Sequence, residues 1–428
     1  MKYVRHVSTR VTPQWERILG SGHVPNSAGG YAFPVDDWVR LDRFLVLGSE
    51  GGSYYAGEHQ LTRENAEAVL RVIREDGRRA VECIREISHA GRAPRNDPAV
   101  FALAMAAKLG DEPTRKAAFE ALPDVARTPT HLFQFAEALQ AFGGWGRATT
   151  RAVAGWYQRE DVSQLAYQAV KYPQREGWTH ADLLRLSHPK APSVAHRDLY
   201  AWIVDGVMPA DGEALRQIKG FEQLQNATAE AEAARLIGEY RLPWETVPTE
   251  LRSSPEVWAA LLPEMPLTAM IRNLATMTRI GLVAPMAEAT RRVVEELGDR
   301  ERIRRARVHP LAILAALKTY EQGHGERGKH TWTPVQEVVD ALNEAFYLAF
   351  DNVEATGKRW LLGVDVSGSM STGAVGGVAG MTPRVAAAAM TLVTAATEPR
   401  HVIMSFQDRF VPLSISPRER LDDVLRRT

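Results

Sequence analysis

Short amphipathic helices follow one another along most of this chain, and this succession constrains the fold more than any other feature. From about residue 60 to residue 355, apolar side chains recur at helical spacing, as in Val81, Ile84 and Ile87. The connections are short, so consecutive helices must pack as antiparallel neighbours. Because there is no strict sequence period, the pattern predicts an irregular α-solenoid of the HEAT type.

Glycine and proline mark the expected ends of these helices. Gly77 is expected to stop one helix. Asp97 is expected to cap the next, with Pro98 at its first helical position. Thr128–Pro129 is expected to begin a later helix. The opening of the chain differs, and there we expect a loop at 26–30, a strand at 43–48 and a turn at 48–53.

Composition excludes several classes of protein. Lys and Arg number 52, as do Asp and Glu, so the chain of 428 residues has no net charge and is no polybasic protein, although a local basic patch is still allowed. The single cysteine, Cys83, excludes an intramolecular disulfide framework and is expected to be a small core residue. No apolar run is long enough to span a bilayer, and the N-terminus lacks a signal-peptide core. We therefore expect a cytoplasmic protein with no membrane partner.

The pattern changes at residue 358, where an α/β sheet is expected to begin. The expected elements are a buried strand at 360–366, a helix at 383–397, strands at 401–406 and 410–415, and a helix from about residue 417. Pro412 suggests that the last strand is irregular or lies at an edge. We therefore expect two domains, a helical domain at 1–357 and an incomplete α/β domain at 358–428.

The expected strand at 360–366 leads into Asp365, Ser367 and Ser369. Open α/β sheets bind ligands at the carboxyl ends of their strands. One carboxylate and two hydroxyls are hard oxygen ligands of the kind that Mg²⁺ takes. The alternative is a turn whose serines only cap backbone groups.

A second motif is basic, since residues 141–200 carry a net charge of +3. Lys171 and Arg175 lie one turn apart if this segment is helical, and tryptophan and histidine nearby can stack on bases. Composition alone favours a solvated helix face instead, with His188 as an N-capping or core histidine.

Two further motifs carry less information. Residues 301–330 have a net charge of +4, for which a solvated helix face is the first interpretation and a phosphate-contacting stripe the second. Residues 323–328 match GxGxxG, but a helical pattern precedes them, so we reject dinucleotide binding. No motif pairs a nucleophile with a base, so we name no catalytic residue and expect no enzyme.

In this order, the segments of the chain resemble the Ro autoantigen family, ring-shaped RNA-binding proteins with a TROVE domain that also occur in bacteria and phages. The DxSxS loop resembles the metal site of von Willebrand factor A domains. The segments that carry the resemblance are 26–30, 43–55, 129–133, 145–147, 171–188, 265–268, 272–274, 309–310, 323–329 and 365–369.

The resemblance implies a closed ring of HEAT-like helix pairs whose ends an A domain brings together. It implies binding of small noncoding Y RNA on the outer basic surface and of single-stranded 3′ ends of misfolded or damaged RNA in the central hole. In bacterial relatives the Y RNA can tether the ring to polynucleotide phosphorylase. The family's Y RNA contacts correspond to Lys171, Arg175 and His188, and Arg147 and Arg185 lie in matching stretches.

For Asp365, Ser367 and Ser369 the resemblance implies Mg²⁺ or another divalent cation, joined by a Thr and an Asp from later loops. Those loops are expected after residue 428, so we expect an incomplete site. A shortened A domain is also expected to leave 361–366 at a sheet edge. A shortened gene, completion by a second chain and a viable half domain all stay open.

The resulting prediction is a non-enzymatic RNA-binding protein that acts in RNA quality control. The alternative is a protein-interaction module that binds an acidic partner through a metal at the Asp365 loop. A nuclease is the third hypothesis, and no paired carboxylates outside that loop support it.

Overall fold

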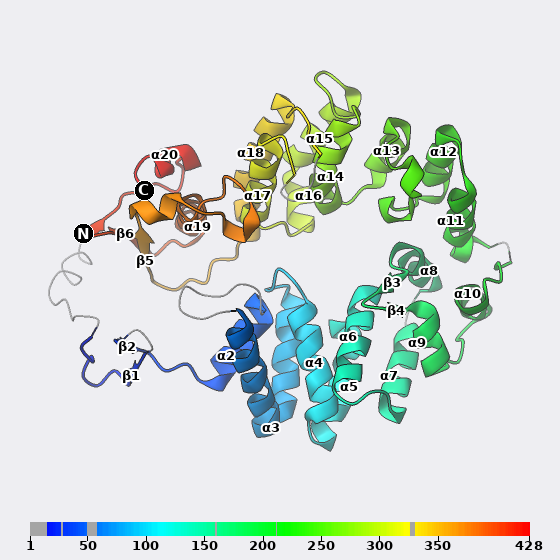
Figure 1. The fold of residues 1–428 in the computed structure, drawn as a ribbon, viewed down its shortest axis with the longest axis horizontal. Helices are drawn as coiled ribbons and strands as arrows, with labels where there is room; N and C mark the ends of the chain where they lie inside the picture. The colour runs from blue at the N-terminus through cyan, green and yellow to red at the C-terminus, as the bar shows by residue number, and fades with distance from the viewer. Residues whose placement is uncertain (1–14, 27–28, 49–57, 159–160, 211, 326–329) are drawn as a thin grey trace. The chain divides into compact units, whose positions relative to one another are not determined.

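The computed structural model describes residues 15–26, 29–48, 58–158, 161–210, 212–325 and 330–428. The described residues form two compact units, one within 15–223 and one within 224–428. Both are built mainly from helices, and a small three-stranded sheet lies near the C-terminus (Figure 1). This confirms the predicted class, a mostly helical protein with a partial α/β part. Closure of a ring and a domain boundary at 357/358 stay predictions.

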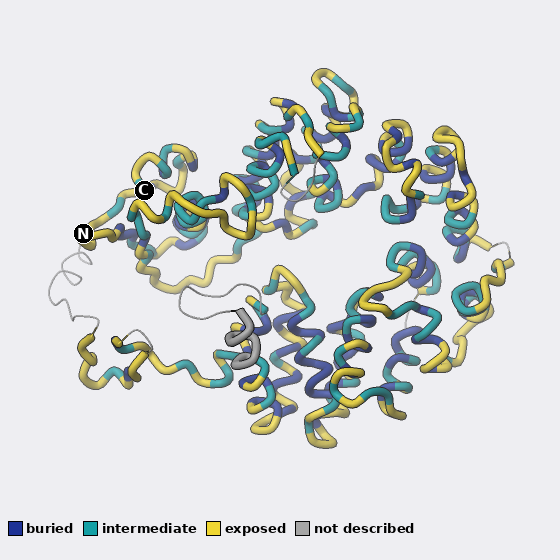
Figure 2. The backbone as a smooth tube through the Cα atoms, viewed as in Figure 1, coloured by how far each residue is buried: buried dark blue, intermediate teal, exposed yellow. Residues whose placement is uncertain are grey.

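In the first unit, short helices stack side by side. Its elements are β1 (Val24–Pro25), β2 (Tyr31–Ala32), α2 (Asp37–Leu47), α3 (Glu58–Ala90), α4 (Asp97–Leu109), α5 (Glu112–Val125), α6 (Pro129–Ala141), α7 (Arg147–Gln158), α8 (Val162–Lys171), β3 (Gln174–Arg175), β4 (Trp178–Thr179), α9 (His180–Ser187), α10 (Val194–Asp205) and most of α11 (Arg216–Asn226). The facing sides of α3 to α6 are buried and form one continuous core (Figure 2). The amphipathic stripes of the sequence therefore pack against one another, as predicted.

Polar caps set the starts of these helices. Thr128 accepts a hydrogen bond from the backbone N–H of His131 at 3.4 Å and begins α6 as predicted. The start of α4 is one residue away from the prediction, since Asn96 occupies the cap position and Asp97 is already helical. Thr179 and Asp182 form a capping box at the start of α9.

Gly77 lies next to a break in α3, close to the predicted helix stop. The backbone at Asp76 leaves the helical region, with φ −150° and ψ 81°, so α3 consists of two helical segments that meet there. A Cβ atom built on Gly77 would lie 2.0 Å from Oγ1 of Thr114 in α5. Gly77 therefore lets α5 approach α3 more closely than a residue with a side chain would allow.

The strand predicted at 43–48 is wrong, because this segment is the last part of α2. Leu41, Phe44 and Leu45 are all buried against the core, because their spacing places them on one face of a helix. In a strand, Phe44 and Leu45 would point to opposite faces. The turn predicted at 48–53 lies outside the described residues beyond Gly48. In the loop predicted at 26–30, the N–H of Asn26 donates to the carbonyl of Gly30, and residues 27 and 28 are not described.

The second unit continues with helices and ends in the sheet. Its elements are α12 (Glu230–Tyr240), α13 (Pro255–Leu261), α14 (Leu267–Arg279), α15 (Glu288–Gly298), α16 (Arg300–Arg305), α17 (Pro310–Glu321), α18 (Gln336–Leu348), β5 (Trp360–Asp365), α19 (Pro383–Thr397), β6 (His401–Phe406), β7 (Phe410–Pro412) and α20 (Leu421–Leu425). The sheet has the order β5-β6-β7, with β5 and β6 parallel and β7 antiparallel. The hydroxyl of Tyr347 in α18 accepts a hydrogen bond from the N–H of Leu421 at 2.9 Å, which fixes α20 to the helical part.

The prediction of a buried first strand is wrong in one respect. Within the described sheet, β5 pairs only with β6, so it is an edge strand. Val364 is buried, but Leu361 is 54% exposed. The edge position itself was predicted, as were α19 and β6. β7 lies at the other edge and ends at Pro412, which has no N–H to donate. The last helix begins at Leu421, four residues after the expected Pro417.

Candidate functional site

A hollow of about 610 Å³ lies between α7 and the turn that follows α9. We call it the cationic hollow. Its lining residues are Gly146, Arg147, Thr150, Arg151, Ala154, Gln158, Ser187, His188 and Lys190. Among these described residues there are three permanent cations, one histidine and no carboxylate. The side chains of Arg147, Arg151 and Lys190 belong to exposed residues, so they can reach a ligand from solvent.

Local structure holds these side chains around the hollow. Arg147 begins α7 and Arg151 follows one turn later, so both project from one face. His188 ends α9 in the left-handed conformation, with φ 46°, and its N–H donates to the carbonyl of Leu184 at 2.9 Å. The side-chain amide of Gln158 donates to the carbonyl of Lys190 at 2.8 Å, which ties the segment after α9 to the end of α7.

The charges in the cationic hollow are not neutralised within the described part of the chain. Neither Arg147, Arg151 nor Lys190 forms an ion pair with any residue described there. The first turn of α7 contains no acidic residue, so its backbone N–H groups add a partial positive charge. Clustered cations at a helix N-terminus make an anion site, and the guanidinium forks of arginine match the geometry of phosphate.

A buried pair of polar side chains joins α7 to α9, the two helices beside the cationic hollow. The hydroxyl of Tyr157 in α7 and Nδ1 of His180 at the start of α9 are 2.8 Å apart, and both side chains are buried. Burial lowers the pKa of His180 to about 4, so the ring is neutral near neutral pH. The pair therefore joins α7 to α9 without adding a buried charge.

The structure brings two of the five predicted RNA contacts together, since Arg147 and His188 both line the cationic hollow. His188 is exposed at a helix C-terminus, so its interpretation as an N-capping or core histidine is wrong. Sequence reasoning missed Arg151 and Lys190. The spacing of Arg147 and Arg151 was a usable signal, whereas Lys190 joins them only through the fold.

Lys171 and Arg175 do not share a helix, so the helical geometry considered for them is wrong. Lys171 is the last residue of α8, and Arg175 lies on β3 of a short hairpin. The intervening Pro173 cannot continue a helix. Glu176 and Gly177, with φ 52° and 79°, form the tight turn of the hairpin.

Lys171, Arg175 and Arg185 each contact another group of the protein. Nζ of Lys171 lies 5.3 Å from the ring centre of Tyr172, and Nε of Arg175 lies 3.1 Å from a carboxylate oxygen of Glu176. Arg185 lines a different hollow, and its guanidinium donates to the carbonyl of Val204 at 2.9 Å, near the end of α10. Arginine commonly satisfies the free carbonyls of a helix end in this way.

The loop at Asp365, Ser367 and Ser369 forms as predicted at the end of β5. Oδ1 of Asp365 accepts from the N–H of Ser367 at 2.8 Å, and the two serine hydroxyls are 3.0 Å apart. These oxygens fit one part of a Mg²⁺ coordination shell and would hold the cation there. Across the described residues, no group of three or more His, Cys, Asp and Glu side chains is placed to bind a metal. Mg²⁺ binding stays a prediction.

Thr382 does not complete this site in the structure. Its hydroxyl accepts from the N–H of Val385 at 3.3 Å and caps α19.

The second basic stretch, at 301–330, contains an arginine with a structural role. Arg302 lies 2.6 Å from Glu296 and donates to the carbonyl of Met265, and its side chain is only 26% exposed. Of the GxGxxG match, residues 326–328 are not described. The helix α17 precedes it, as predicted.

Cys83 is half-buried and its thiol donates to Asp42, so the expected core position is only partly met. Burial is the main cause that raises the pKa of this thiol to about 12. The thiolate is therefore disfavoured, which argues against a redox role.

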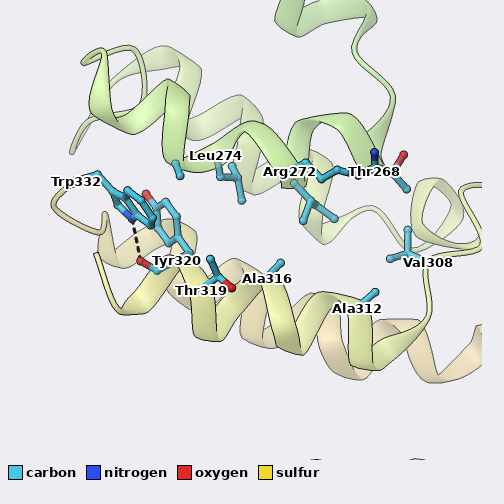
Figure 3. Close-up of a pocket in the computed structure, with 11 residues that line it drawn as sticks. Thr268, Arg272, Leu274, Val308, Ala312, Ala316, Thr319, Tyr320 and Trp332 are labelled. Carbon is cyan, nitrogen blue, oxygen red and sulfur yellow. Dashed lines mark hydrogen bonds between the residues drawn. The ribbon is translucent and has the colours of Figure 1, made fainter. Parts of the chain in front are cut away.

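A second hollow, of about 360 Å³, lies between α14 and α17 in the other unit (Figure 3). Small residues of α17, Ala312 and Ala316, form one wall, and Tyr320 and Trp332 lie at one end. Arg272 extends along the opposite wall. No carboxylate is among the described residues that line it.

In the described part of the chain, no helix combines the length and the apolar character needed to cross a membrane.

Comparison with known proteins gives one consistent result. The TROVE domain matches residues 24–319, and the Ro60 vWA domain matches residues 359–428. Together these define a TROVE protein with an A-type domain, and the chain belongs to the Ro60 family.

The relatives include the RNA-binding protein RO60 of Deinococcus radiodurans, which is 45% identical over 99% of this chain and 80% of the relative. The Caenorhabditis elegans protein of the same name is 32% identical over 94% of this chain and 74% of the relative. The crystal structure of the Deinococcus radiodurans RO (RSR) protein matches with a TM-score of 0.80 and 45% identity, over 92% of this chain and 79% of that one. These matches confirm the family that the motifs predicted.

Proposed function

We propose that this protein binds structured RNA, without catalysing a reaction on it, and that the cationic hollow is the place where RNA phosphates bind. The observation that carries the proposal is the group of Arg147, Arg151 and Lys190 around one concavity, none of them neutralised by a described carboxylate. Phosphate contacts supply most of the affinity in sequence-independent RNA binding. The relatives named RNA-binding protein RO60 support the same function.

We further propose which RNA is bound and in which process the protein acts. The RNA is a small noncoding Y RNA, which binds on the surface that includes Lys171, Arg175 and His188. The protein acts in RNA quality control in the cytoplasm and meets polynucleotide phosphorylase through the RNA. These points rest on the family resemblance.

The test is fluorescence anisotropy with a labelled stem-loop RNA over a range of salt concentrations. Three neutralised phosphates predict a slope of log K against log salt of about −2.7, so affinity should fall about 40-fold between about 50 and 200 mM salt. Folded protein that binds no RNA at the lowest salt would contradict the proposal.

For single-stranded 3′ ends, we propose the hollow between α14 and α17. It offers the guanidinium of Arg272 to a phosphate, and the partly exposed ring of Trp332 at the end of an apolar wall to a base. Tyr320 is buried, and its ring centre lies 6.4 Å from that of Trp332 with the planes at 25°, so Tyr320 supports the Trp332 ring. Stacking on aromatic side chains is the usual way in which proteins hold unpaired bases.

Arg272→Ala is expected to weaken binding of a stem-loop RNA with a single-stranded 3′ tail about fivefold to tenfold, because one charge-assisted contact is lost. Binding of the same stem-loop without a tail should not change. Arg279→Ala is the matched control, since Arg279 is an exposed arginine of the same helix that does not line the hollow. Equal effects of both substitutions, or an effect on the blunt stem-loop, would contradict this placement.

A metal-dependent protein-interaction role for the Asp365 loop is a separate candidate. The convergence of Asp365, Ser367 and Ser369 in one loop favours it.

A further inference from the structure

A second surface of the first unit has the opposite charge to the cationic hollow. Two adjoining hollows, of about 410 and 580 Å³, share Glu137 and Glu176. Together they form a groove along α6, between α4 on one side and the β3–β4 hairpin with α9 on the other. We call it the acidic groove. Its acidic lining residues are Asp97, Glu137, Glu176 and Asp182, and its only lining cation among the described residues is Arg185.

The floor of the acidic groove is apolar and aromatic. Phe44 and Phe101 lie in it with ring centres 6.0 Å apart, beside Pro98. Further along, Trp178 lies against Trp145, with ring centres 5.8 Å apart and planes at 21°. A groove with such a floor can hold apolar side chains as well as charges.

The carboxylates at the rim are not equivalent. Asp97 pairs with Arg95 at 2.9 Å, and Glu176 pairs with Arg175 at 3.1 Å. Asp182 belongs to the capping box of α9. Glu137 lies where the two hollows join and, within the described ranges, accepts a hydrogen bond only from the indole N–H of Trp178, at 3.0 Å. Of the residues that the structure describes, none forms an ion pair with Glu137.

Glu137 is therefore an exposed carboxylate beside an indole ring, and its oxygens can accept further hydrogen bonds. No cation of the part of the chain that the structure describes pairs with it. RNA is a poor occupant of this groove, because its phosphates would face the carboxylates at the rim. A guanidinium or ammonium group suits it, since it can pair with Glu137 and lie against the neighbouring aromatic surface.

We propose that the acidic groove docks a basic peptide segment of another protein. A Lys or Arg of that segment pairs with Glu137, and a neighbouring apolar side chain packs over Phe44 and Phe101. Charge complementarity selects this occupant over an acidic peptide or a nucleic acid. The groove shares no lining residue with the cationic hollow, so RNA held in that hollow leaves the groove open to a protein partner.

The test uses a fluorescein-labelled peptide of alternating arginine and leucine, with a peptide of alternating glutamate and leucine as the specificity control. Glu137→Gln keeps an acceptor for the indole of Trp178 but removes the charge. It is expected to raise the Kd of the arginine peptide about fivefold, the loss of one partly exposed ion pair. Glu120→Gln, at an exposed glutamate of α5 outside the groove, is the matched control and should leave the Kd unchanged.

A second variant tests the groove at another position, so that the result does not depend on the folding of Glu137→Gln alone. Ala141→Lys places a cation at an exposed groove position at the end of α6, and it should weaken the arginine peptide at least as much. Stem-loop RNA binding should be unchanged in both variants, and saturating RNA should not displace the peptide. The proposal is overturned if the arginine peptide does not bind saturably at low salt. Equal losses for Glu120→Gln, or competition between RNA and peptide, would overturn it as well.

Discussion

Replacing both Arg147 and Arg151 with alanine is expected to weaken binding of a stem-loop RNA about 100-fold at low salt. Each guanidinium forms a charge-assisted contact worth about 1.5 kcal/mol, and the two contacts are lost together. Because two fewer phosphates are neutralised, the slope of log K against log salt should become shallower by about 1.8. Anisotropy titrations of wild type and variant give both quantities.

The matched control is Arg115→Ala/Lys116→Ala, which removes the same charge from exposed positions of α5 in the same unit. It should change the affinity little, because these residues do not line the cationic hollow. Lys171→Ala/Arg175→Ala should weaken binding to a lesser degree than Arg147→Ala/Arg151→Ala, since Arg175 must first leave Glu176. If Arg115→Ala/Lys116→Ala lowers the affinity as much as the hollow variant, only the total charge matters and the proposed site is wrong.

Gly77→Ala is expected to destabilise the first unit by about 3 kcal/mol. This value is near the upper end of the usual cost of adding a carbon atom to a well-packed core. The added Cβ would lie 2.0 Å from Oγ1 and 2.5 Å from Cγ2 of Thr114, and Thr114, on α5, is itself buried. Helices α3 and α5 would have to separate, which exposes part of the core between them. Thermal unfolding followed by circular dichroism measures the effect.

Gly155→Ala is the control for this substitution, because Gly155 lies inside α7 and a Cβ built on it meets nothing within 4 Å. There alanine should stabilise the helix by about 0.5–1 kcal/mol through its higher helix propensity. The two substitutions are chemically identical, so they should shift the melting temperature in opposite directions. A shift of the same sign for both would show that the close approach of α3 and α5 is not as described.

The helices could largely be predicted from the sequence, because their signals are local. Thr128 caps α6 through its own side chain, and α19 follows from a proline start and an apolar stripe. The segment at 43–48 was misread because a short apolar run fits a strand as well as a helix. Only the contacts of Leu41, Phe44 and Leu45 with the core resolve that ambiguity.

The candidate site was less predictable, because residues far apart in sequence form it. Arg147 and His188 were named through the family resemblance, and the fold then placed them in one hollow. Lys190 joins them only because α9 ends in a left-handed turn and Gln158 holds the following segment. The acidic groove gave no sequence signal, since Glu137 and Glu176 come together through the β3–β4 hairpin.

The most direct test of the central claim, that RNA binds in the cationic hollow, is amide hydrogen exchange of the protein with and without a stem-loop RNA. Slower exchange is expected in peptides covering 146–158 and 186–190 when RNA is bound, with little change along the acidic groove at 134–141. RNA that binds tightly but protects only other parts of the chain would contradict it.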